Sequence, residues 1–159
     1  MIVPRVRTPL DREGMRAALQ AGHHQHFGMP CNREREACAL AMACIEHANG
    51  AAIWCFNFGN IDATADWTGD AFALAADEVL DGKRARRTKL LRAHACAEDG
   101  AADFWRFLAE RFELALIRFD DGDPIGAAHA LKRGGWYTGS EADYAKAMHA
   151  IFLEVYDAA

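Results

Sequence analysis

Apolar residues at helical spacing are the feature that most restricts what this chain can fold into. Between residues 37 and 45 they recur at i, i+3, i+4, i+7 and i+8, which places them on one face of a helix. They are Ala37, Leu40, Ala41, Cys44 and Ile45. A second set, over residues 104–119, comprises Phe104, Leu108, Phe112, Ala115, Leu116 and Phe119. With heavy use of alanine, these faces predict a mainly α fold, and 159 residues suffice for one domain spanning 1–159.

Residues suited to cap a helix precede four of the predicted helices. They are Thr8, Asn32, Asp123 and Ser140. The first helix is expected to end near Gly22, and the helix after Asp123 near Gly134. These signals, with the apolar faces, predict five or six helices.

Helical spacing is lost between residues 62 and 94. The runs 72–80 and 88–94 predict two short strands joined through a turn at Asp81-Gly82. The basic residues from Lys83 to Arg87 are expected to lie in a solvated hairpin loop. The sequence therefore predicts a small β-hairpin beside the helices.

Charge and hydropathy exclude two classes of partner. The net charge of −5, from 18 basic and 23 acidic residues, argues against a nucleic-acid-binding protein. No apolar run approaches the roughly 20 residues that a membrane span needs. The N-terminal residues also lack the apolar region of a signal peptide.

Neither the cysteines nor the histidines predict a metal site. The five cysteines show no C-x-x-C spacing, so a zinc site is not expected, and most should be buried as small apolar residues. His23, His24 and His26 lie close together near a predicted helix end, with no acid or thiol motif beside them. We interpret them as a solvated histidine patch.

One carboxylate directly follows the first apolar face. Glu46 comes one residue after Ile45, so it lies at the edge of the buried face and in the last turn of its helix. The negative end of the helix and partial burial both oppose ionisation, and the carboxyl should therefore hold its proton unusually well. A general acid needs this property. The same context also fits an ordinary surface glutamate at a helix end.

Seven short motifs, the first of which ends at Glu46, occur in an informative order. They are Ala43–Glu46, Phe56–Ile61, Trp67–Gly69, Ala76–Val79, Leu91–Ala95, Leu131–Thr138 and Asp143–Ala145. This order resembles the lysozyme-like glucosaminidases of the flagellar and autolysin type, glycoside hydrolase family 73, over about residues 32–156. The resemblance implies a lysozyme-like helical domain with a small β-hairpin lobe. It also implies cleavage of β-1,4 glycosidic bonds in peptidoglycan glycan strands, of the endo-N-acetylglucosaminidase type, without a metal or cofactor.

Three departures mark the chain as a divergent relative. The family has a small residue, glycine, an aromatic residue and glycine after its catalytic glutamate, whereas this chain has His47-Ala48-Asn49-Gly50. Ala76 replaces the threonine two places before the second glutamate, and Leu91-Arg92-Ala93-His94 replaces F-R-x-Y. Since Glu46 and Glu78 are both present, we interpret the chain as an active hydrolase.

The resemblance assigns roles to particular residues. Glu46 would be the general acid and Glu78, on the hairpin, the second carboxylate that glycosidic cleavage usually requires. Asp62, Asp66 and Asp77 are alternatives for the second role. Sugars have apolar faces and N-acetyl groups, so cleft walls and orienting amides are also expected. The candidates are Trp67, Tyr137 and Tyr144 for the walls, and Asn57 and Asn60 for orientation.

Other functions remain open at this stage. A domain that binds peptidoglycan without cutting it, a muramidase, and a helical interaction domain unrelated to sugars would all fit the pattern. A hydrolase of this kind acts in the periplasm or cell wall. Without a signal peptide it would be a phage lysin, a flagellar or secretion component, or an effector exported by a dedicated machine, and an effector implies a cognate immunity protein.

Overall fold

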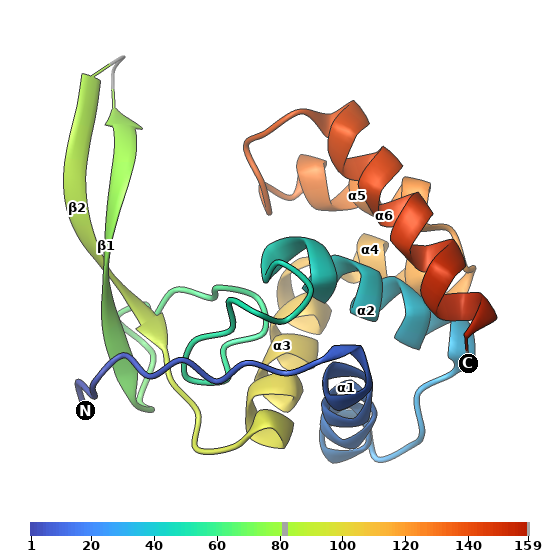
Figure 1. Ribbon diagram of the computed structural model, residues 1–159, viewed down its shortest axis with the longest axis horizontal. Coiled ribbons are helices and arrows are strands. Elements are labelled where there is room, and N and C mark those ends of the chain that lie inside the picture. Colours follow the sequence, from blue (N-terminus) through green and yellow to red (C-terminus); the bar gives the residue numbers. More distant parts are fainter. Residues whose placement is uncertain (81–82, 159) are drawn as a thin grey trace.

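The computed structural model describes the backbone of residues 1–80 and 83–158, and the side chains of residues 1–75 and 88–158. Its elements are α1 (Arg12–Phe27), α2 (Arg33–Glu46), β1 (Ala71–Leu80), β2 (Lys83–Arg92), α3 (Ala97–Arg111), α4 (Glu113–Asp120), α5 (Pro124–Arg133) and α6 (Glu141–Asp157). Figure 1 shows the helices packed together and the hairpin standing beside them. This confirms the predicted mainly α fold with a small β lobe. Among the described residues, no helix is both long and apolar enough to cross a membrane.

Helix α2 occupies the centre of the helical body and contacts α1, α4 and α6. Every residue from Glu36 to Cys44 is buried. The sequence predicted a single buried face, but the neighbouring helices surround α2 on all sides, as befits a helix with small apolar residues all round. The buried carboxylate of Glu36 is balanced by Arg16, 3.0 Å away.

The first helix is shifted along the chain from its predicted position. Asp11, not Thr8, is the N-cap, and its side chain accepts the Gly14 N–H at 2.8 Å. The Thr8 hydroxyl instead accepts the Phe56 N–H at 2.9 Å. Gly22 does not end α1, which continues to Phe27. Gly22 is needed for packing, since a Cβ there would lie 2.5 Å from a backbone nitrogen of α3.

The other three capping predictions are confirmed. Side chains of Asn32, Asp123 and Ser140 each accept a backbone N–H in the first turn of α2, α5 and α6, respectively. The long apolar face of residues 104–119 is carried by two helices, because Phe112 leaves helical geometry with φ −136° and ψ 40°. That break lets α4 change direction and pack against α5.

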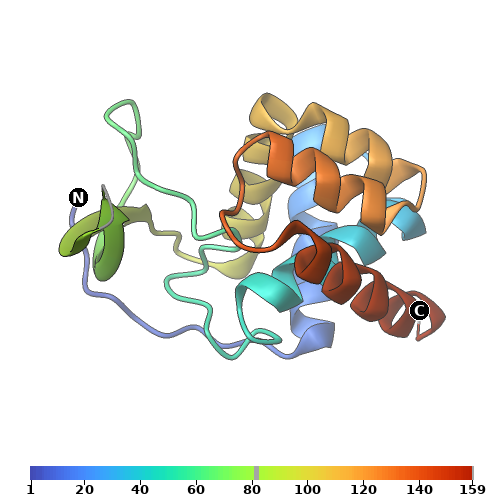
Figure 2. The ribbon, with the colours of Figure 1, turned by 90° about the horizontal axis from the view of Figure 1, so that it is seen from above.

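The β-hairpin is longer than the sequence predicted. β1 and β2 pair antiparallel from Ala71 opposite Arg92 to Leu80 opposite Lys83. Lys83–Arg87 therefore belong to strand β2, and the predicted basic loop is wrong; their side chains lie outside the described residues. Seen from above, the hairpin is separate from the helices and is reached through extended segments (Figure 2).

A buried ion pair fastens the base of the hairpin to α3. Arg92, the last residue of β2, lies 2.9 Å from Asp103, and both side chains are buried. His94 and Arg106 also contact this carboxylate. Burial alone would raise the pKa of Asp103, but hydrogen bonds from His94 and Arg106 and the charge of Arg92 outweigh it and lower that pKa. The Arg92 guanidinium also lies over the ring of Trp67, 4.5 Å from its centroid.

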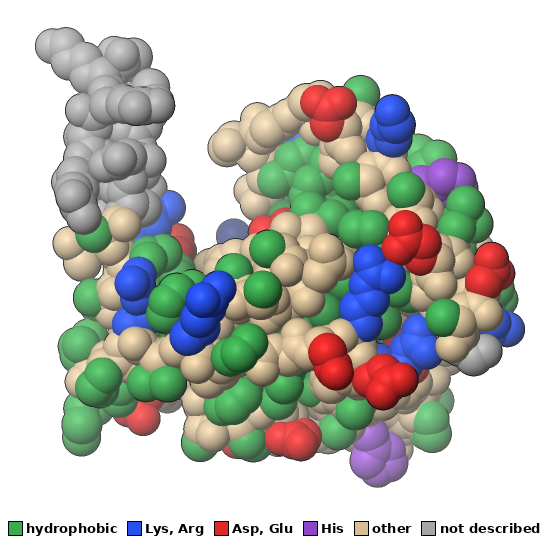
Figure 3. Space-filling model, viewed as in Figure 1, with side chains coloured by type: hydrophobic (Ala, Val, Ile, Leu, Met, Phe, Trp, Pro, Cys, Tyr) green, Lys and Arg blue, Asp and Glu red, His purple; other side chains and the backbone are tan. Residues whose placement is uncertain are grey.

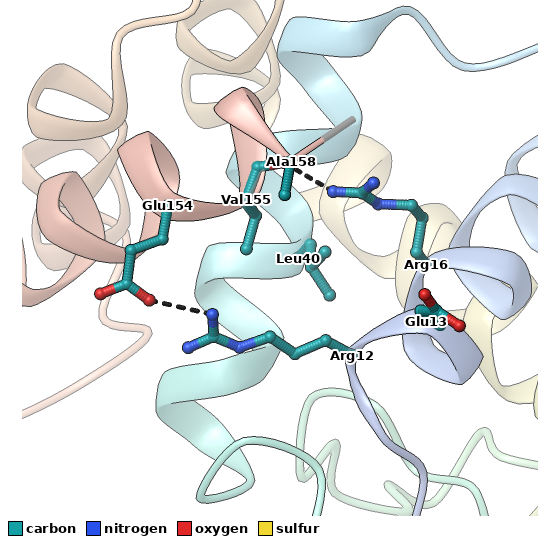
Figure 4. Close-up of a pocket in the computed structure, with 7 residues that line it drawn as sticks. All are labelled: Arg12, Glu13, Arg16, Leu40, Glu154, Val155 and Ala158. Carbon is teal, nitrogen blue, oxygen red and sulfur yellow. Dashed lines mark hydrogen bonds and ion pairs between the residues drawn. The ribbon is translucent and has the colours of Figure 1, made fainter.

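A small pocket of about 120 Å³ lies where α1 meets α6 (Figure 4). Arg12 pairs with Glu154 at 2.9 Å, and Arg16 donates to the Val155 carbonyl at 2.6 Å. Arg12 and Arg16 thus join the first helix to the last.

The cysteines form no disulfide, and their thiols are free. Four of them are buried, and Cys96 is half-buried. Burial raises the pKa of Cys31 to about 12, so its thiol stays protonated near neutral pH. The expectation that most cysteines act as small buried residues is confirmed.

The ion pair at the hairpin base should be important for stability. We expect Asp103→Asn to lower the free energy of unfolding by about 3 kcal/mol, because it leaves the buried Arg92 charge without a balancing carboxylate. Urea denaturation measures this. Asp99→Asn, at an exposed position of the same helix, is the control and should cost less than about 1 kcal/mol. Equal losses in the two variants would contradict the role of the buried pair.

Candidate active site

A cleft of about 500 Å³ lies between the base of the hairpin and the helical body. Its lining comes from the end of α2, the loop 59–64, the end of α3 with Phe112, and the loop 134–138, with Lys89 contributed by β2. Figure 3 shows the molecular surface hollowed beside the helical body. Segments from all along the sequence therefore converge on one cleft, and the last residue of α2 is part of its lining.

Glu46 is that residue, and its carboxyl group is held by two donors. Trp136 Nε1 and Tyr144 Oη each donate to Oε1, both at 2.9 Å. Because these bonds occupy the lone pairs of Oε1, a proton on this carboxyl group belongs on Oε2. Burial, reinforced by the neighbouring Glu46 charge, raises the pKa of the Tyr144 hydroxyl, which therefore remains a donor. The Glu46 side chain is half-buried, and it lies at the end of α2 as predicted.

His47, a departure from the family pattern, lies behind this site. Its ring is fully buried, and neither ring nitrogen has a hydrogen-bond partner among the described residues. Burial lowers the pKa of His47, which keeps the ring neutral near pH 7. The histidine at position 47 therefore adds no charge next to Glu46.

Three aromatic side chains form one wall of the cleft, which we call the aromatic wall. Phe107, Phe112 and Trp136 all line the cleft and are half-buried. Ring centroids lie 5.9 Å apart for the two phenylalanines, and 6.1 and 5.3 Å from Trp136 to Phe107 and Phe112. Their apolar surfaces suit the C–H faces of sugar rings. Trp136 belongs to the wall and also donates to Glu46, so it couples the two.

Two glycines allow the aromatic wall to pack closely. A Cβ on Gly59 would lie 2.8 Å from the ring of Trp136, and one on Gly134 would lie 2.6 Å from the ring of Phe112. Both distances are shorter than a carbon–carbon contact allows. Because Gly59 and Gly134 have no side chain, the rings of Trp136 and Phe112 can lie directly against the backbone.

The two predicted orienting amides occupy different environments. Asn60 is exposed in the cleft lining, and its amide donates to the Glu46 carbonyl at 3.5 Å. Asn57 is 1% exposed. Its amide donates to the carbonyls of Ile61 and Arg92 at 3.0 and 2.9 Å. Asn57 thus builds the turn, and this placement contradicts the predicted substrate contact.

The predicted aromatic residues do not form the cleft wall. Tyr137 stacks on Tyr144 with centroids 3.9 Å apart, and its hydroxyl donates to the Ala128 carbonyl at 3.0 Å. Trp67 packs over Arg92 and donates to the Asp70 carbonyl. Neither Tyr137 nor Trp67 is among the described residues that line the cleft. Tyr144 reaches the site differently from the prediction, as a donor to Glu46.

The residues of the aromatic wall carry no distinctive sequence signal, for identifiable reasons. Phe112 fits the apolar face of residues 104–119, which predicts a place in the helical core. Phe107 lies beside that face, so helical spacing gave it no role. Trp136 directly follows Gly134-Gly135, and the same position that suggested Tyr137 as a cleft residue applies equally to it. Only the three-dimensional structure separates these neighbours.

The candidates for the second carboxylate are only partly described. Glu78 lies on β1 opposite Ala85, but its side chain and that of Asp77 are outside the described residues. Asp62 is exposed in the lining of the cleft. Asp66 is also exposed, and a hydrogen bond from Thr64 lowers its pKa. Of the two described aspartates, Asp62 is the one in the cleft.

Comparison with solved structures identifies the architecture. The peptidoglycan hydrolase of Sphingomonas sp. A1 matches with a TM-score of 0.64 at 20% identity, over 91% of this chain and 95% of that chain. The fold is lysozyme-like. The glycoside hydrolase domain of Salmonella typhimurium FlgJ matches with a TM-score of 0.60 at 19% identity, over 92% and 89% of the two chains. No protein-family model and no curated sequence matches. The lysozyme-like helical domain with a hairpin lobe is confirmed, and the low identities agree with a divergent sequence.

The close contact at Gly59 gives a test of how the aromatic wall is held. We expect Gly59→Ala to displace the Trp136 ring and weaken its bond to Glu46, at a cost of about 1–3 kcal/mol in stability. The indole N–H resonance of Trp136, assigned by comparison with Trp136→Phe, should shift. Gly139→Ala is the matched control, because a Cβ there meets nothing within 4 Å. An unchanged resonance in Gly59→Ala would show that the contact does not position the ring.

Proposed function

We propose that this protein hydrolyses β-1,4 glycosidic bonds in the glycan strands of peptidoglycan, with Glu46 as the general acid. The observation that carries the proposal is the Glu46 carboxyl group, oriented by Trp136 and Tyr144 in a cleft with an aromatic wall. The names of the structural neighbours, a peptidoglycan hydrolase and a glycoside hydrolase domain, support the same substrate class.

The geometry suggests how Glu46 would act. A strand bound in the cleft would rest a sugar face on the aromatic wall, near the Glu46 carboxyl. Oε2 would give its proton to the leaving oxygen as the C1–O bond breaks, and positive charge would develop at C1 and the ring oxygen. Glu46 becomes negative in this step, so the hydrogen bonds from Trp136 and Tyr144 strengthen in the transition state. Water then adds to C1 and loses one proton to a carboxylate, and Glu46 regains a proton before the next cycle.

The proposed bond is that on the reducing side of N-acetylglucosamine. We propose that Asn60, which is exposed in the lining of the cleft, binds an N-acetyl group, a group that both sugars of the strand carry. Cleavage after N-acetylmuramic acid, the muramidase specificity, is the alternative. Mass spectrometry of digested peptidoglycan distinguishes them by the sugar at the new reducing end.

The central test is Glu46→Gln, which keeps the shape of the side chain and removes the acid proton. Hydrolysis of purified sacculi should fall by about 10²–10⁴-fold, because general acid catalysis contributes this much. The melting temperature should stay close to that of the wild type. Glu154→Gln, at an exposed position on α6, is the control and should retain activity. Nearly normal hydrolysis by Glu46→Gln would remove Glu46 from the mechanism.

A second test identifies the partner carboxylate, for which we propose Glu78. Glu78→Gln should lower kcat more than it raises KM, because the charge acts mainly in the transition state. Asp62→Asn and Asp66→Asn are the matched comparisons and should have smaller effects. If Asp62→Asn loses turnover and Glu78→Gln does not, the role belongs to Asp62, the described aspartate of the cleft.

Two alternatives predict different outcomes in the same assays. A module that binds peptidoglycan without cutting it would sediment with sacculi and show no turnover. A helical interaction domain would neither bind nor cut them. If hydrolysis is found, the substrate assigns the activity to the periplasm or cell wall. For an exported effector, we propose a cognate immunity protein that occupies the cleft.

A further inference from the structure

A second hollow continues from the cleft along the helices. It has a volume of about 490 Å³ and lies between the junction of α3 with α4 and the C-terminal end of α5. The two hollows share Arg111, Phe112 and Gly134 as lining residues. A molecule bound in the cleft can therefore extend into this second hollow, which we call the side groove.

Two arginines line the side groove, and neither is paired with a carboxylate among the described residues. Arg111 and Arg133 are exposed, at the last positions of α3 and α5. Arg106 and Arg118, on α3 and α4, are each paired with an aspartate. Within the part of the chain that the structure describes, neither Arg111 nor Arg133 forms an ion pair. Two guanidinium groups are thus available to an anionic ligand.

The remaining lining residues limit the kind of ligand that the side groove can bind. Glu110 also lines the groove, but its carboxylate is paired with Arg106, 3.8 Å away. Glu113 is in the first turn of α4, where the positive helix end stabilises a carboxylate. Leu114, 64% exposed, and the ring of Phe112 add apolar surface. The combination suits a ligand that carries both carboxylates and short apolar side chains.

We propose that the side groove binds the peptide stem of the substrate, with Arg111 and Arg133 holding its carboxylates. This inference rests on the proposed hydrolysis of peptidoglycan, in which every second sugar carries a short peptide with several carboxylates. Guanidinium groups bind carboxylates through two parallel hydrogen bonds. A strand in the cleft would bring its stem to the adjoining groove. The enzyme would then select strands that carry peptides over unsubstituted amino-sugar polymers.

The test compares intact peptidoglycan with glycan strands from which an amidase has removed the stems. Stripping leaves a carboxylate on each lactyl group, so the comparison isolates the peptide from the acidic sugar. We expect the wild type to have about tenfold higher kcat/KM on intact strands, from charge-assisted hydrogen bonds. Arg133→Gln, at a residue that lines the side groove and not the cleft, should lose most of that advantage and match the wild type on stripped strands. Arg118→Gln, whose guanidinium pairs with Asp121, is the control and should behave like the wild type.

Each outcome separates this inference from the proposed function. A wild type that cuts both substrates equally well, or stripped strands better, would overturn stem binding and leave hydrolysis in place. An Arg133→Gln variant that loses activity equally on both substrates would also overturn it. A wild type that cuts neither substrate would reject the proposed function itself. Arg133→Lys keeps the charge but lacks the planar guanidinium that binds a carboxylate through two hydrogen bonds, and should fall between the wild type and Arg133→Gln.

Discussion

The burial of α2 on all sides is the constraint on which the rest of the structure depends. Residues 36–44 touch other helices around the whole circumference of α2, and small alanine and cysteine side chains let those helices approach closely. A polar residue inside this stretch needs an internal partner, as Glu36 has in Arg16. The C-terminal end of α2 is where the helix leaves the packed interior, and Glu46 lies there, between the core and the cleft.

Glu46 and the aromatic wall are one unit in this molecule. Trp136 belongs to the aromatic wall and donates to Glu46, and its ring is positioned against Gly59. A shift of the wall would therefore move the carboxyl group as well. The hairpin is held separately, through Arg92 and Asp103, so the two sides of the cleft rest on different contacts with α3.

Features encoded locally were predictable from the sequence. The caps Asn32, Asp123 and Ser140 act within one turn of their own helices, and the end of α2 at Glu46 follows from its apolar spacing. The predicted start of α1 was wrong, because the Thr8 hydroxyl accepts the N–H of the distant Phe56. The predicted length of the hairpin was wrong, because the backbone of Lys83–Arg87 continues the pairing with β1. The donors to Glu46 could not be derived from spacing, since they come from another part of the chain. Trp136 and Tyr137 are adjacent and chemically similar, and only packing decides which lines the cleft.

The distance along the chain between Glu46 and its donors has a consequence for when the site can exist. Trp136 and Tyr144 follow Glu46 by 90 and 98 residues. At about 5–20 residues per second, a ribosome needs roughly 5–20 s to add them after Glu46 has been made. A nascent chain, or a fragment, that ends before Trp136 would contain Glu46 but neither of its two donors. The hydrogen-bonded arrangement around Glu46 would thus arise only after Tyr144 has been made, and it would be incomplete in any fragment that ends before α6.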